Sequence, residues 1–435
     1  MGNISQKKLE ARWKRAWWRL GGVVCSRQVG QDEELIIGPW PNEFGEGCQL
    51  MFKKIFCRAA SALHLDGHHP PAPTSEEHKM TVRSTVKVGN TTLAKIGHGL
   101  MTMTWVPTQV PDDIAFEAIK TSLDAVPAGV KMLLNAAEFY GEPHDFTANL
   151  DLVARFFEKY PSYADKAFLS GGTKENAYVP DNSLENLRRS VDNCLKHLRG
   201  TKKIDLFEPC RIDNKYPVED QIRALTVLQK EGKFDYIGLS ECSAASLRKA
   251  QAVAPITMVE IEVSPIAYEE ETKKGIGYIL IADKLFLKPY FAVIATCAEF
   301  GIIIEAYSPM GKGLLTGALT KLEDLPAGDH RSRFSRFTPE NFEYNSKIVD
   351  AFNSIAATKG VTPAQLSIAW VSSKGPHIIP LPGSSKKSRT EENLAACDIK
   401  LTEAEIAQID AAVAATPVKG GRAVDGLESV FMLWG

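Results

Sequence analysis

The sequence has little net charge, no paired cysteines and no long apolar run. Its formal net charge is −2, so no basic surplus predicts a nucleic-acid partner. Its eight cysteines are scattered without a CxxC pair or a His/Cys cluster. This pattern indicates reduced intracellular thiols, predicts no metal site, and excludes a disulfide framework. The most apolar segment, 275–293, is interrupted by Asp283, Lys284 and Lys288, which predicts no membrane span.

A glycine-rich dinucleotide fingerprint is also missing. An open doubly wound sheet usually carries one after its first strand, but the first candidate strand here runs into Gly97-His98-Gly99-Leu100-Met101. Eight short apolar runs alternate with stretches of 3.6-residue periodicity. They lie near 96–99, 132–135, 167–170, 204–207, 235–239, 258–263, 302–306 and 377–381. This alternation predicts an α/β fold, a parallel (β/α)₈ TIM barrel.

The barrel is expected over residues 81–435. A β-hairpin around Gly89-Asn90 is predicted to plug one end of it. Residues 1–80 differ in composition and end in a proline-rich linker, 68–74. They are expected to be a poorly ordered extension or a wrongly predicted exon, the alternative being a basic amphipathic helix for a membrane surface or for import.

Polar residues follow the predicted strands at their carboxyl ends, where chemistry sits in such barrels. Asn135 ends the second strand, and Tyr140 follows on a turn before Gly141. A phenol can donate a proton to a carbonyl oxygen if neighbours lower its pKa from about 10. The alternative is a tyrosine that only plugs the mouth of the barrel.

The motifs at these strand ends resemble, in order and spacing, those of the aldo-keto reductase family, and most closely its fungal pyridoxal reductase branch. They are Asn135-Ala-Ala-Glu-Phe-Tyr-Gly141, Asp205-Leu-Phe207, Ile237-Gly-Leu-Ser240, Ala306-Tyr-Ser-Pro-Met-Gly-Lys-Gly-Leu-Leu-Thr-Gly317 and Pro380-Leu-Pro-Gly-Ser-Ser385, followed by Arg389 and Asn393. The resemblance implies reduction of an aldehyde or ketone by NADPH bound across the barrel mouth, without a Rossmann fold.

The resemblance also implies roles for individual residues. Tyr140 would donate the proton. The residues implied to bind the cofactor are Tyr307 on the nicotinamide ring, Ser240, Glu241 and Glu260 near the carboxamide, Ser308, Met310, Gly311, Lys312, Gly313 and Leu314 at the pyrophosphate, and Ser384, Arg389 and Asn393 at the adenosine end. An aromatic face suits a planar ring, and the Arg389 guanidinium suits the 2′-phosphate of NADPH.

Three positions of the family's tetrad depart from its pattern. Asn135 stands at the aspartate position and Cys210 at the histidine position. Leu169-Ser170 runs directly into Gly171-Gly172, so the lysine is missing, and Lys174 is the nearest substitute. An ammonium group would lower the pKa of the tyrosine, so its loss predicts weak or no turnover unless Lys174 replaces it.

An insertion at about 275–292 separates segments that the resemblance would join. It is interpreted as a retained intron or misassembled exon, or as a genuine loop.

The residues expected to line the substrate site are Trp105, Phe139, Arg211 and 331–334.

The resulting hypothesis is an NADPH-dependent reductase of a small aldehyde, with the reduction of pyridoxal to pyridoxine as the candidate reaction. The protein is expected to be cytoplasmic and a monomer or weak dimer, with no nucleic-acid or membrane partner. The alternative is a catalytically weak or inactive nucleotide-binding barrel.

Overall fold

The computed structural model describes residues 24–29, 32–37, 80–173, 179–268, 276–281, 284–424 and 435. The chain divides into two units, 1–76 and 77–435. In the first unit, β1 (Val24–Val29) and β2 (Asp32–Ile37) form an antiparallel pair. The second unit contains the barrel and carries all the functional arguments below.

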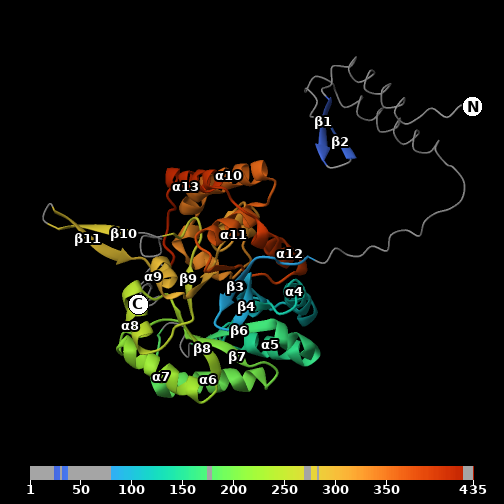
Figure 1. Cartoon of the computed structure of the whole chain (residues 1–435). Coiled ribbons are helices and arrows are strands. Elements are labelled where there is room, and N and C mark those ends of the chain that lie inside the picture. Colours follow the sequence, from blue (N-terminus) through green and yellow to red (C-terminus); the bar gives the residue numbers. More distant parts are fainter. Residues whose placement is uncertain are drawn as a thin grey trace, which may run out of the picture. The chain divides into compact units, whose positions relative to one another are not determined.

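Eight parallel strands of the second unit form the predicted TIM barrel (Figure 1). They are β4 (Thr91–Gly99), β5 (Lys131–Ala137), β6 (Ala167–Thr173), β7 (Ile204–Pro209), β8 (Phe234–Ser240), β9 (Met258–Glu262), β12 (Ile303–Tyr307) and β13 (Ile378–Leu381). A bridge between Gly99 and Gly383, supported by a 3.1 Å bond from the Gly99 amide to the Pro382 carbonyl, joins the first strand to the last. The predicted fold class is therefore confirmed.

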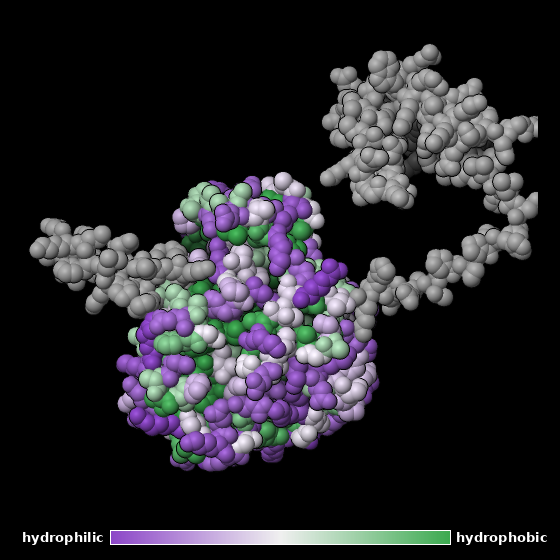
Figure 2. Space-filling view, in the orientation of Figure 1, coloured by the Kyte–Doolittle hydropathy of each residue, from purple (hydrophilic) through white to green (hydrophobic). Residues whose placement is uncertain are grey.

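Helices follow the strands and surround the barrel, as the 3.6-residue periodicity predicts. They are α3 (Met101–Thr104), α4 (Asp112–Asp124), α5 (Ala148–Lys159), α6 (Leu184–Leu198), α7 (Val218–Lys230), α8 (Ala244–Val253), α9 (Val293–Phe300), α10 (Pro339–Lys359), α11 (Pro363–Ser373), α12 (Lys387–Ala395) and α13 (Glu403–Ala415). No helix among the described residues is long and apolar enough to span a membrane. The face in Figure 2 is largely hydrophilic, with hydrophobic residues in smaller areas between.

The second unit contains two antiparallel hairpins besides the parallel strands of the barrel. β3 (Thr85–Val88) pairs with the start of β4, and Val88 and Leu93 from this hairpin pack into the barrel interior, as a plug would. β10 (Ile276–Ile281) pairs with β11 (Lys284–Phe291) in the predicted insertion. These two strands form a sheet of their own, so the insertion adds a hairpin without interrupting the order of the barrel strands.

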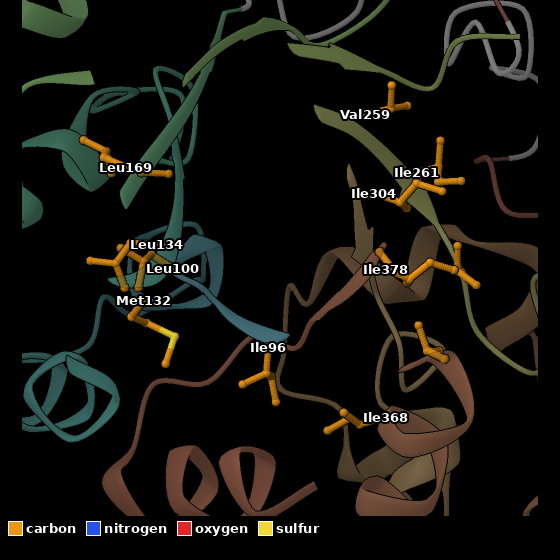
Figure 3. Packing of buried hydrophobic residues seen from close by; sticks show 14 of the residues in the cluster. Ile96, Leu100, Met132, Leu134, Leu169, Val259, Ile261, Ile304, Ile368 and Ile378 are labelled. Carbon is orange, nitrogen blue, oxygen red and sulfur yellow. The ribbon is translucent and has the colours of Figure 1, made fainter. Parts of the chain in front are cut away.

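Successive strand residues face opposite sides of the barrel wall, because side chains alternate along a strand. Leu134 and Leu169 belong to the large cluster between strands and helices (Figure 3). Their neighbours Leu133 and Phe168, together with Leu206, belong to a second cluster that fills the interior. Two residues further along each of these three strands the interior becomes polar, and this change of chemistry creates the candidate site.

The Asp205-Leu206-Phe207 motif has a structural role in this barrel. The Asp205 Oδ2 atom accepts a 2.8 Å hydrogen bond from the Leu169 amide and lies 2.5 Å from Lys202 Nζ. Both charged side chains are only 4% exposed. The pair therefore ties β7 to β6 inside the protein.

Replacing Asp205 with alanine should lower the free energy of unfolding by about 3–5 kcal/mol, because the Lys202 ammonium would remain buried without its partner. Urea denaturation measures the change. Asp235→Ala is the matched control, since Asp235 pairs with Lys203 at the surface, and should cost less than about 1 kcal/mol. Equal losses in the two variants would contradict this account.

Candidate active site

The loop after β5 holds Tyr140 at the mouth of the barrel. Glu138 anchors this loop to α6: its carboxylate accepts hydrogen bonds from Ser190 Oγ at 2.5 Å, Asn193 Nδ2 at 2.8 Å and Arg189 Nη1 at 3.0 Å. The Thr104 hydroxyl donates to the Tyr140 carbonyl at 2.6 Å. The position of the phenol is therefore fixed by contacts to two other elements.

The Tyr140 phenol faces the polar layer inside the barrel. Its hydroxyl lies 3.4 Å from Asn135 Oδ1, which accepts the hydrogen bond. The Trp105 ring stacks on the Tyr140 ring with centroids 6.1 Å apart, and His330 stacks on Trp105 at 6.2 Å. Aromatic rings thus cover one side of the phenol.

Three glutamates occupy the polar layer next to Asn135. Glu208, Glu260 and Glu305 come from β7, β9 and β12, and one carboxylate oxygen of each lies within 4.8 Å of the others. Asn135 Nδ2 donates to Glu260 Oε2 at 2.8 Å and to Glu305 Oε2 at 3.3 Å. Asn135 therefore connects the phenol to the carboxyl groups.

Burial raises the pKa of each of these carboxyl groups. Glu260 raises the pKa of Glu208 further, and burial together with Glu260 raises the pKa of Glu305 to about 8. The pKa of Tyr140 is also raised, first by burial and then by Glu260, and Arg211 acts in the opposite direction. The phenol accordingly keeps its proton through neutral pH.

The structure describes only some of the positions that correspond to the family's tetrad. Lys174 lies outside the described residues. Cys210 is half-buried, and its Sγ atom would lie 3.3 Å from a Cβ atom added at Gly172. Gly172 therefore faces the interior beside Cys210, at the place on β6 where the missing lysine is expected.

Ser240, Glu241 and Tyr307 lie together, as the resemblance implies. The Tyr307 hydroxyl donates to Glu241 Oε1 at 2.7 Å, and Arg211 Nη1 donates to Ser240 Oγ at 3.4 Å. Glu241 is completely buried and pairs with Arg422 at 3.1 Å. Sequence reasoning missed this Arg422 contact, since no motif includes the residue.

The segment predicted for the pyrophosphate has an unusual backbone. Ser308, Gly311, Lys312 and Gly313 all have positive φ, at 49°, 59°, 57° and 91°. Turns of this kind form the concave backbone sites that bind anions. However, the amides of Gly311, Gly313 and Leu314 donate to carbonyls within the loop, and Lys312 Nζ binds Glu262 Oε1 at 2.7 Å.

The predicted adenosine end contains a buried polar chain. Ser384 Oγ lies 2.8 Å from Thr390 Oγ1 and 3.0 Å from His98 Nε2, and His98 Nδ1 lies 3.0 Å from Ser122 Oγ. Burial lowers the pKa of His98 to about 4, so its ring is neutral at pH 7. Arg389 is exposed on α12 and Asn393 is buried behind it.

A family model described as "Aldo/keto reductase family" matches residues 95–414. The chain belongs to the aldo/keto reductase family. It is similar to the probable pyridoxal reductase 2 of Schizosaccharomyces pombe, with 37% identity over 72% of this chain and 89% of that protein. It is also similar to the NADP(+) aldo-keto reductase yakc of the same yeast, with 34% identity over 80% of this chain and 97% of that protein.

Two solved structures share the fold. One is a glycerol dehydrogenase from Gluconobacter oxydans, with a TM-score of 0.63 and 23% identity, covering 78% of this chain and 98% of that chain. The other is a thermostable aldo-keto reductase in complex with epalrestat, with a TM-score of 0.55 and 20% identity, covering 76% of this chain and 100% of that chain. The similarity to these two structures confirms the barrel fold of this member of the reductase family.

Glu305→Gln should stabilise the protein increasingly as the pH rises. Between about pH 4.3, the ordinary value for glutamate, and the folded pKa of about 8, the unfolded chain has lost a proton that the folded chain keeps. Stability of the wild type therefore falls across this window and levels off above it. The midpoint of thermal unfolding, measured from pH 5 to 9, should show the difference.

The control is Glu343→Gln, because Glu343 is exposed on α10. This variant should follow the wild type at every pH. A constant offset between Glu305→Gln and wild type across the range would contradict the assigned titration.

Proposed function

We propose that this member of the aldo/keto reductase family reduces a small aldehyde with NADPH, with Tyr140 as the proton donor. Pyridoxal is the first candidate substrate, because a relative with 37% identity is named a pyridoxal reductase. NADPH is the candidate cofactor because a second relative is named for NADP(+). The observation that carries the proposal is the half-buried Tyr140 side chain, whose phenol is held beside Asn135 under an aromatic wall.

The residues at the barrel mouth fit the proposed cofactor. The Arg211 guanidinium contributes to the electrostatic environment of both Tyr140 and Tyr307 by lowering the pKa of each. The four positive-φ residues of the 308–313 turn give a concave backbone. Binding of a pyrophosphate there would require the amides of Gly311, Gly313 and Leu314 to exchange their carbonyl partners within the loop for phosphate oxygens. Arg389 is available for the adenosine phosphate. NADPH, when bound, would supply a hydride to the carbonyl carbon.

The chain's own residues would perform the remaining steps. Tyr140 Oη would transfer its proton to the carbonyl oxygen, and the raised pKa of Tyr140 keeps that proton in place beforehand. Asn135 Oδ1 would orient the hydroxyl, and Trp105 would exclude water from its outer side. The cytoplasmic location and the monomeric or weakly dimeric state stay predictions.

The raised pKa of Tyr140 also favours the second candidate, a barrel that binds nucleotide with little or no turnover. A phenol whose pKa lies far above the working pH is a weak acid catalyst. NADPH fluorescence titration paired with NADPH oxidation in the presence of pyridoxal separates the two candidates. Binding without oxidation would support the second.

Tyr140→Phe should reduce kcat for pyridoxal by about 10²–10⁴-fold, because it removes the proton donor and keeps the ring. The affinity for NADPH, measured by fluorescence, should stay within about twofold of wild type if the barrel is intact. Phe146→Leu serves as the matched control, because Phe146 is exposed on the same loop, and it should keep the kcat of the wild type. Retained turnover in Tyr140→Phe would contradict the assigned role.

Gly172→Lys should raise kcat, because it places an ammonium group beside Cys210 and Glu208, where it would lower the pKa of Tyr140. An increase of about tenfold corresponds to one pKa unit. A Cβ atom at Gly172 would lie 3.1 Å from the Glu208 carbonyl, so the strands must shift by a few tenths of an ångström. Gly172→Met has a similar length without the charge and should not increase kcat.

A further inference from the structure

The carboxyl layer below Tyr140 contains buried polar atoms that the contacts among the described residues leave without hydrogen-bond partners. Glu208 and Glu305 are 3% and 0% exposed, and each has one buried carboxylate oxygen without a hydrogen-bond partner in the described part of the chain. Buried polar atoms are usually paired. The third member, Glu260, is half-buried, so it connects this layer to the mouth.

The Ser170 hydroxyl is a further buried polar group of this layer, contributed by β6. Ser170 is in register with Asn135 on the neighbouring strand and is fully buried. It lies close enough to Glu305 to affect that carboxyl group, yet its Oγ atom has no partner of acceptable geometry among the described residues. A hydroxyl and two carboxylate oxygens thus offer lone pairs to the same layer.

Few positive charges lie near this carboxyl layer among the described residues. Arg211 acts on Glu260 and also on Glu241 and Tyr307, so its positive charge is shared. From β6, the residue that faces Glu208 and Cys210 is Gly172, which has no side chain. β6 therefore supplies no second cation at this point.

We propose that Glu208, Glu260 and Glu305 form a subsite for a positively charged nitrogen. The aldehydes reduced best would carry a protonated amine or pyridine nitrogen a few bonds from the carbonyl. This inference rests on the proposed function. With the carbonyl oxygen at Tyr140, the connection through Asn135 leads directly to Glu260.

The charge on the substrate would also assist the reaction. Burial and mutual repulsion disfavour ionised carboxylates in this layer, and a cation placed among them favours the ionised form. The same cation lies near the phenol and stabilises the developing phenolate. Substrate binding would thereby supply the positive charge that Gly172 does not.

The test compares two aldehydes of the same shape. 4-[(Dimethylamino)methyl]benzaldehyde is protonated at pH 7, and 4-isobutylbenzaldehyde replaces its nitrogen with carbon. The ratio of their kcat/KM values with NADPH, cationic over neutral, should fall by about tenfold or more in Glu260→Gln, a loss of about 1.4 kcal/mol. It should fall similarly in Gly172→Lys, which brings its own ammonium.

Asp145→Asn is the matched control, since Asp145 is an exposed acid on the loop after β5. Its ratio should equal that of the wild type. An unchanged ratio in Glu260→Gln, with both aldehydes reduced, would overturn the subsite and leave the proposed function standing. Tight binding of Mn²⁺ alone, abolished by Glu260→Gln, would overturn it in favour of a metal site.

A binding measurement tests the subsite even if the protein has no measurable turnover. The dissociation constant of N,N-dimethylbenzylamine from the NADPH-loaded protein, followed by tryptophan fluorescence, should rise by about tenfold or more in Glu260→Gln. That result without reduction of either aldehyde would reject the proposed function and keep the subsite. Equal binding by wild type and variant would reject the subsite.

Discussion

The alternation of side chains along the barrel strands determines both the stability of this protein and its chemistry. Leu133, Phe168 and Leu206 fill the interior, and the residues two positions later on the same strands are Asn135, Ser170 and Glu208. A shift of one residue would exchange the interior for the helix-facing side. The apolar cluster therefore fixes the register that brings the polar layer together.

The polar layer is costly to bury, and the fold compensates only part of that cost. Asn135 donates to two of the three glutamates, and the Arg211 guanidinium favours the ionised form of Glu260. Other buried acids at the mouth are paired more fully: Glu241 and Glu262 contact Arg422 and Lys312. This contrast separates residues that hold the mouth together from residues that remain available to a ligand.

The sequence predicts the elements of this barrel well, because each strand is a short apolar run and each helix has its own periodicity. Tyr140 and Tyr307 are also predictable, since both follow directly from local motifs. Arg422 and His98 are not, because their partners lie far away in the sequence and meet them only when the barrel closes. The inward direction of Glu305 depends likewise on register, which an apolar run alone does not fix.

The barrel closes between β4 and β13 through one backbone bridge, which joins Gly99 to Gly383. The other neighbouring barrel strands share three to six paired positions. Among the neighbouring strands of the barrel, β4 and β13 therefore share the fewest paired backbone positions. The residue after Gly383 is Ser384, which binds His98 on β4. The contact between the Ser384 and His98 side chains therefore adds a second connection between the ends of β4 and β13, where the backbone pairing is shortest.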